Sequence, residues 1–198
     1  MKENNLILAS GSPRRRELLS LYTTDFTVCV SDFDESAVTA PTPAQLVEQL
    51  AIGKCLAVAK QHPDAVVIGC DTVVDVDGQV LGKPRDREDA RRMLDSLSGR
   101  THRVHTGVCI QAPGEQRHFC VTTEVEFWPL DAAERDAYLD SGEPYDKAGG
   151  YGIQGGAAKF VRGIRGCYFN VVGLPVSQVH RALRSMACWQ ALGFDESD

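Results

Sequence analysis

The amino-acid sequence predicts an α/β protein built on a mixed β-sheet. Helical and strand patterns alternate over the first half of the chain, and two long strand patterns joined near Pro113 and Gly114 form a hairpin in the second half. The composition, 43% hydrophobic and 24% charged, is that of a globular protein. No long polar linker or internal repeat divides the chain. We therefore expect a single domain over residues 1–198, with a frayed tail at 193–198.

Apolar periodicity and turn residues place the individual elements. In chain order the sequence predicts a strand at 6–9, a helix at 13–22, a strand within 25–35, a helix over 42–62, a strand hairpin over 65–81, a helix over 86–99, the paired long strands within 100–130, a helix over 131–142, a glycine-rich segment at 146–161, a strand pair around 163–166 and an amphipathic helix over 174–192.

The first three helices have clear start signals. Ser12 is suited to cap the first helix, with Pro13 in the first helical position, where no N–H is needed. Thr42 and Pro43 repeat this arrangement at the second helix, and Asp86 caps the third. These signals fix where the turns before each helix lie.

Three consecutive arginines, Arg14 to Arg16, occupy the first turn of the first helix. Cations at a helix N-terminus oppose the helix dipole, and adjacent like charges repel each other. The free N–H groups of the same turn favour anions. This unfavourable placement indicates that a negatively charged group, such as a phosphate chain, normally binds in the turn.

Composition excludes several classes of function. A net charge of −6 and a pI near 5.4 argue against a general nucleic-acid binder. No apolar run approaches the roughly 20 residues of a membrane span, and the N-terminal apolar stretch is too short for a signal peptide. The seven cysteines form no C-x-x-C pair and are interpreted as buried free thiols. We expect a cytoplasmic protein that binds neither nucleic acid nor a membrane.

Asp71 is the strongest candidate for a catalytic or metal-binding residue. It follows the apolar run Ala65–Cys70, so its carboxylate should emerge at the end of a buried strand. A carboxylate placed there can hold a divalent metal or accept a proton from water, although an ordinary turn aspartate is the alternative. Glu35, preceded by Asp32 and Asp34, is either a second metal ligand or part of a solvated acidic loop.

Two lysines and two histidines complete the candidates. Lys54, in the second helix, and Lys83, in a Gly-Lys-Pro turn, either hold phosphates or are surface charges. His102 and His105 are three apart on a predicted strand, so they face opposite sides and cannot readily share a metal. Taken alone, the residues indicate an α/β protein whose arginine turn and carboxylates suit a metal–polyphosphate ligand.

The stretch LILASGSPRRRELL closely resembles the signature that opens the Maf family of nucleoside triphosphate pyrophosphatases. Further motifs similar to those of the family follow in the expected order: DFDE, GCDTVV, GKPRD, LSGRTHRVHTGV, EPYDKAGGYGIQG and NVVGLP. The resemblance spans Leu6 to about Leu183, nearly the whole chain.

This resemblance implies a fold and a reaction. The fold is an elongated mixed sheet flanked by helices, with two lobes around a nucleotide cleft, as in Maf and inosine-triphosphatase-like proteins. The reaction converts a nucleoside triphosphate and water to the monophosphate and pyrophosphate. Glu35 and Asp71 would hold a divalent metal cation, Mg²⁺ or Mn²⁺, and Asp71 would accept the proton of the attacking water.

The resemblance also assigns substrate contacts. Arg14 and Arg15 would grip the triphosphate at the helix N-terminus, beside Ser10. Lys54 and Lys83 would neutralise more of the phosphate charge, whereas Arg16 is expected at the surface.

Three positions resemble the branch of the family that acts on dTTP and UTP: Arg14 after the proline turn, Thr72 after the aspartate, and Gln154 in the glycine-rich segment. An amide such as that of Gln154 can both donate to and accept from a uracil or thymine edge. The alternatives are a 7-methyl-GTP pyrophosphatase of the same family, or a nucleotide-binding regulator of cell division that acts without turnover. A homodimer is compatible with either.

Overall fold

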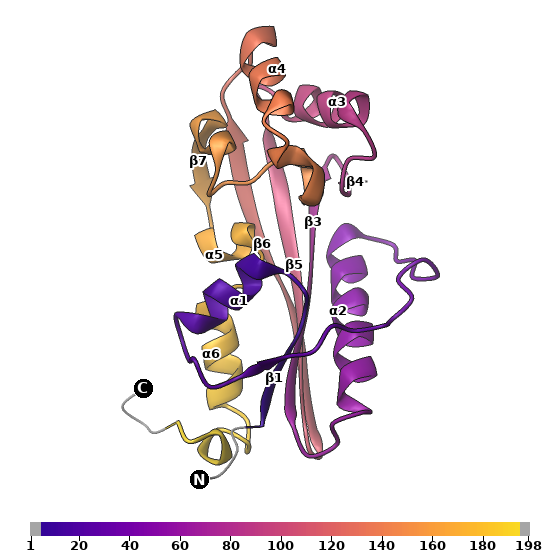
Figure 1. Ribbon diagram of the computed structural model, residues 1–198, viewed down its shortest axis with the longest axis vertical. Coiled ribbons are helices and arrows are strands. Elements are labelled where there is room, and N and C mark those ends of the chain that lie inside the picture. The colour runs from indigo at the N-terminus through magenta and orange to yellow at the C-terminus, as the bar shows by residue number, and fades with distance from the viewer. Residues whose placement is uncertain (1–4, 195–198) are drawn as a thin grey trace.

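The structure of the protein is a computed structural model, described here for residues 5–194 (Figure 1). A mixed sheet of seven strands, in the order β2-β1-β3-β5-β6-β7 with β4 paired to β3, runs along the long axis of the molecule. Helices flank it, with α1 and α6 on one side and α2 on the other in the view of Figure 1. The predicted α/β class with a mixed, helix-flanked sheet is confirmed.

The strands are β1 (Leu6–Ala9), β2 (Thr27–Val28), β3 (Val66–Val76), β4 (Gln79–Leu81), β5 (Thr101–Ala112), β6 (Glu115–Phe127) and β7 (Val161–Arg165). The α-helices are α1 (Pro13–Ser20), α2 (Pro43–Ala59), α3 (Arg87–Leu97), α4 (Ala132–Asp140), α5 (Tyr168–Val172) and α6 (Val176–Arg184). Short 3₁₀ turns are η1 (Glu143–Asp146), η2 (Ala148–Gly150), η3 (Gly156–Phe160) and η4 (Gln190–Leu192). The expected caps are present: the side chains of Ser12, Thr42 and Asp86 each accept a hydrogen bond from the backbone N–H three residues later.

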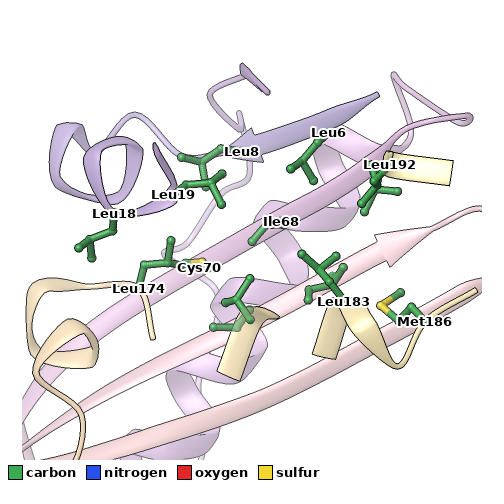
Figure 2. Close-up of a cluster of buried hydrophobic side chains, with 14 of the residues drawn as sticks. Leu6, Leu8, Leu18, Leu19, Ile68, Cys70, Leu174, Leu183, Met186 and Leu192 are labelled. Atoms are coloured by element: carbon green, nitrogen blue, oxygen red, sulfur yellow. The ribbon is translucent and has the colours of Figure 1, made fainter. Parts of the chain in front are cut away.

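Three hydrophobic clusters lie along the sheet: two, on its opposite faces, belong to a lower lobe and one belongs to an upper lobe, and the two lobes share the long strands. The lower lobe holds the packing of β1, α1 and α6 against β3 and β5, where Leu8, Ile68 and Leu183 are buried (Figure 2). On the other face of the sheet, α2 covers Val67 and Cys109. The upper lobe is formed by α3, α4 and the turns η1, η2 and η3 around its own hydrophobic cluster. The two lobes implied by the family resemblance are therefore observed.

The strand β3 has an unpaired stretch on one of its edges. Along that edge β1 pairs with residues 66–69 and β4 pairs with residues 74–76, while β5 pairs with residues 67–75 along the opposite edge. Residues 70–73 of β3 therefore have no strand neighbour on the side where β1 ends and β4 has not begun. We call this stretch the β3 gap.

The C-terminal third differs from the sequence prediction. The amphipathic helix ends at Arg184 rather than at 192, and the apolar residues that extended its pattern, Met186 and Trp189, pack against the lower core from turns instead. The predicted strand pair near residues 163–166 is one strand, β7, because its partner is the distant β6. Phe194, assigned to a frayed tail, packs against the ring of Trp189; residues 195–198 lie outside the described part of the chain.

All seven cysteines are free thiols, as predicted. Three are buried, namely Cys55, Cys70 and Cys109, whereas the other four are only half-buried, so the prediction of general burial was wrong. Among residues 5–194 we find no helix with the length and apolar character needed to span a membrane.

Candidate active site

A cavity of about 980 Å³ opens between the two lobes at the β3 gap. It is lined by all nine residues that the sequence proposes for the site: Ser10, Arg14, Arg15, Glu35, Lys54, Asp71, Thr72, Lys83 and Gln154. Because β3 has a free edge here, side chains from both of its faces reach the cavity. The prediction that Asp71 lies at a strand end was wrong: it is the middle residue of β3 and reaches the cavity through the β3 gap. Asp71 comes from the face that α2 covers, and Thr72 comes from the opposite face.

Two glycines bring α2 close enough to the sheet for Lys54 to reach Asp71. A Cβ at Gly69 would lie 2.6 Å from the backbone oxygen of Ala51, and a Cβ at Gly107 would overlap the backbone of Val47. With no side chain at either position, α2 packs directly on β3 and β5. The Lys54 Nζ then donates a hydrogen bond of 2.6 Å to Asp71 Oδ1, and both side chains are nearly buried, at 14% and 13% exposure.

A third glycine positions Glu35. Gly53 lies on α2 where a Cβ would overlap the ring of Phe33, so the absence of a side chain lets that ring dock on the helix. The docked ring holds the acidic loop against α2. Glu35 Oε2 consequently lies 3.0 Å from Lys54 Nζ, and the two carboxylates of Glu35 and Asp71 converge on one cation.

Arg15 is held by four protein acceptors. Its guanidinium donates to Gly173 O (2.9 Å), Ser10 Oγ (3.2 Å), Cys70 O (2.9 Å) and Thr72 Oγ1 (3.0 Å). Arg15 thus links α1, β3 and the segment before α6, and places a fixed positive charge at the floor of the cavity. Contact of Arg15 with a phosphate stays a prediction.

Arg14 reaches across the cleft to the upper lobe. Its Nη1 lies 3.0 Å from Asp146 Oδ2, and Lys147 Nζ lies 2.6 Å from Asp146 Oδ1. Partial burial acts to raise the pKa of Asp146, but the hydrogen bonds from Lys147 and Arg14 outweigh it, and the pKa lies below its ordinary value. Asp146 therefore remains an anion that orients Arg14 at the mouth of the cavity.

The sequence motifs contained further cavity residues to which the sequence reasoning gave no role. Glu143, Asp146 and Lys147 belong to the stretch EPYDKAGG, and Gly173 belongs to NVVGLP. Their spacing alone gives no signal of a site, because they reach the cavity only after the 3₁₀ turns fold the chain back. The only available signal was the presence of two acids and one base within the five residues of EPYDK.

The thiol beside Asp71 is inert. Cys70 lies in the lower core, and burial raises the pKa of its thiol to about 12. A cysteine nucleophile at this position is therefore disfavoured, and the burial of Cys70 agrees with the predicted buried thiol.

The geometry defines a class of protein: an α/β protein with a deep cleft in which a helix N-terminus, several cations and a pair of convergent carboxylates face one another. The family model described as "Maf-like protein" matches residues 5–186. The chain belongs to the Maf family.

Three relatives show how close this similarity is. The chain is 49% identical to the dTTP/UTP pyrophosphatase of Halalkalibacterium halodurans, covering 90% of this chain and 94% of the relative. It is 50% identical to the dTTP/UTP pyrophosphatase of Bacillus velezensis (90% and 95% covered) and 50% identical to that of Symbiobacterium thermophilum (91% and 92% covered). A solved Staphylococcus aureus Ham1 protein is similar over 62% of this chain and 71% of its own, at 20% identity and a TM-score of 0.46.

Proposed function

We propose that this protein hydrolyses dTTP and UTP to the monophosphate and pyrophosphate with the aid of a divalent cation, Mg²⁺ or Mn²⁺. The observation that supports this most directly is the convergence of Glu35 and Asp71 on the Lys54 ammonium, inside a cleft that also holds the arginine turn. Relatives with the printed name dTTP/UTP pyrophosphatase, about half identical over nine-tenths of the chain, support the same substrate class.

The residues present fit a divalent metal. Mg²⁺ is usually held by one or two protein carboxylates together with substrate phosphates, rather than by a cage of protein ligands. Glu35 and Asp71 supply such a pair. Among the described residues, no group of three or more His, Cys, Asp or Glu side chains is arranged to hold a metal ion. A metal held by Glu35 and Asp71 would supply charge neutralisation to the triphosphate and acidity to the attacking water.

The chain's own groups divide the remaining work. Asp71, at the β3 gap, is the proton acceptor for the water that attacks the α-phosphorus, and the leaving pyrophosphate carries away the negative charge that develops. Arg14, Lys54 and Lys83, which all line the cavity, offset that charge. The N-terminus of α1 adds its backbone dipole, with Ser10 in the turn before it.

A binding protein without turnover would need these cations but not a buried carboxylate at the reacting centre. The presence of both Glu35 and Asp71 therefore favours catalysis over the regulator alternative. Arg14, Thr72 and Gln154 favour the dTTP/UTP branch over 7-methyl-GTP. We further propose that the enzyme works in the cytoplasm, where its seven thiols stay reduced, and a homodimer stays a prediction for solution measurements.

The test measures pyrophosphate release from dTTP, UTP, CTP, dATP and 7-methyl-GTP with Mg²⁺ or Mn²⁺, and identifies the nucleotide product by chromatography. We expect dTMP and UMP with pyrophosphate; dTDP and orthophosphate would contradict the proposal, and a preference for 7-methyl-GTP would contradict the substrate assignment.

The matching variant is Asp71→Asn, which keeps the shape of the side chain but cannot accept the proton. We expect hydrolysis to fall by about 10²-fold or more, with the melting temperature close to that of the wild type. Asp77→Asn, in the exposed turn between β3 and β4, is the control and should retain activity.

A further inference from the structure

The segment that presents Gln154 to the cavity has little regular structure of its own. Gln154 lies between the turns η2 and η3, within residues 151–156, and its side chain is exposed to the cavity. Three of these residues, Gly152, Gly155 and Gly156, are glycines, which leave the backbone free to take many conformations. Contacts from outside the segment must therefore hold its backbone if the Gln154 amide is to hydrogen-bond a base in one fixed position.

The carboxylate of Glu143 and the hydroxyl of Tyr138 hold both ends of this segment. Glu143 Oε2 accepts a hydrogen bond of 2.8 Å from the N–H of Gly156. Glu143 Oε1 accepts one of 3.2 Å from the hydroxyl of Tyr138, and the Tyr138 oxygen accepts one of 3.2 Å from the N–H of Gly152. Two side chains therefore anchor the backbone two residues before Gln154 and two residues after it.

The glycines of the segment leave the space that the side chains of Glu143 and Lys147 occupy. A Cβ at Gly155 would overlap the Glu143 carboxylate, and a Cβ at Gly152 would lie 2.6 Å from the side chain of Lys147. The Lys147 ammonium in turn donates 2.7 Å to the backbone oxygen of Glu143. Tyr138 is 3% exposed and packs edge-on against Phe160, so its hydroxyl has a fixed position.

We propose that Glu143, backed by Tyr138, is a positioning residue that fixes the Gly152–Gly156 segment and thereby sets the selectivity of the enzyme for pyrimidine nucleotides. This role rests on the proposed function. Glu143 acts through the backbone that carries Gln154, whereas the groups proposed to bind the triphosphate lie on α1, α2, β3 and the turn after β4. Loosening the segment should therefore affect the choice of base before it affects the reaction itself.

The experiment compares Glu143→Ala, Tyr138→Phe and Gly155→Ala with the wild type. Gly155→Ala displaces the Glu143 carboxylate without changing its chemistry, and Glu88→Gln, an exposed acid on α3, is the matched control. Two quantities are measured: amide hydrogen exchange of residues 152–156 without nucleotide, and the ratio of kcat/KM for dTTP to that for dATP.

We expect faster exchange in all three variants and a drop of the selectivity ratio by about tenfold in Glu143→Ala and Gly155→Ala, carried mainly by a higher KM for dTTP. Glu143→Gln keeps one acceptor and should recover part of the ratio. The control should match the wild type in both quantities.

If amide hydrogen exchange of residues 152–156 is unchanged in the variants, Glu143 and Tyr138 do not fix this segment. Faster exchange with an unchanged ratio, or an equal loss of kcat with every nucleotide, would overturn the selectivity role. A wild-type enzyme that shows no pyrimidine preference would instead contradict the proposed function. Because hydrogen exchange is measured without nucleotide, it tests the Glu143 anchor separately from the substrate preference.

Discussion

The ammonium of Lys54 on α2 lies 2.6 Å from the carboxylate of Asp71 on β3, and both groups are almost buried. Glu35, from the loop before α2, lies 3.0 Å from the same ammonium. One cation thus lies between two acids that would otherwise repel each other, and the three groups together keep a net charge of −1. Lysine occupies the point on which both proposed metal ligands converge.

This relationship predicts that Lys54 and a divalent cation compete when no nucleotide is present. Replacing Lys54 by Met removes the competing charge, and we expect Mn²⁺ to bind the nucleotide-free protein about tenfold more tightly. Calorimetric titration measures the affinity directly. Lys60→Met, at the exposed end of α2, is the control and should leave the affinity unchanged. An equal or weaker affinity in Lys54→Met would contradict the shared position.

Gly53→Ala should separate stability from activity. Alanine in a helix interior is ordinarily more stable than glycine by about 1 kcal/mol, but here the new Cβ would force the Phe33 ring from α2 and displace Glu35. We therefore expect hydrolysis to fall by about tenfold or more while the melting temperature is unchanged or higher.

Phe33→Ala tests the same contact from the other side and should lower activity in a similar way. If Gly53→Ala retains full activity, the docking of Phe33 does not position Glu35.

Arg14 and Arg16 should differ in their effects on substrate binding. Arg14 lines the cavity and contacts Asp146, whereas Arg16, about 200° further round the helix, is exposed. We expect Arg14→Ala to raise the KM for dTTP strongly and Arg16→Ala to raise it only slightly. Equal KM values for the two variants would contradict the cavity assignment of Arg14.

His102 should make the stability of the fold depend on pH. Burial lowers the pKa of His102 from its usual value of about 6.5 to about 4. Between these two values the unfolded chain binds a proton that the folded protein does not, so the free energy of unfolding falls as the pH drops from 6.5 to 4, by about 3 kcal/mol in all. Above pH 6.5 this residue contributes no pH dependence.

Urea denaturation of His102→Phe at pH 7 and pH 4 measures this contribution. The variant loses the hydrogen bond to Tyr151 at both pH values. The free energy of unfolding should therefore change by about 3 kcal/mol less between pH 7 and pH 4 than it does in the wild type. His62→Asn, at an exposed position, is the control, and its free energy of unfolding should depend on pH as in the wild type.

Local signals predicted the first two-thirds of the fold because those elements are specified by nearby residues. The caps at Ser12, Thr42 and Asp86 are predicted directly from the chain and occur as expected. The strand hairpin predicted over 65–81 also occurs, with its turn at Asp77. The predicted final helix is too long because Met186 and Trp189 continue its apolar spacing. In the structure these two residues lie in turns after the helix and are buried there. A spacing rule cannot distinguish these two ways of burying the same side chains.

The sequence motifs predicted which residues lie near one another, but not the contacts that they make. The nine proposed residues meet in one cavity, but no sequence pattern predicts that Arg15 contacts four protein acceptors or that Glu143 and Asp146 reach the cavity. Those contacts depend on the β3 gap and on 3₁₀ turns without a periodic pattern. They follow from the packing of distant segments.

The long hairpin of β5 and β6 has a mechanical consequence. Its twelve consecutive residue pairs run from Thr101 to Ala112 and cross from the upper core into the lower one, beside the continuous strand β3. A domain hinge ordinarily lies in a few loop residues, and between these lobes the connection is a hydrogen-bonded ribbon instead. Bringing the lobes together requires the ribbon to flex as an elastic sheet. We therefore expect nucleotides to enter a largely preformed cleft, with adjustment confined to side chains such as Arg14 and to the turns that face them.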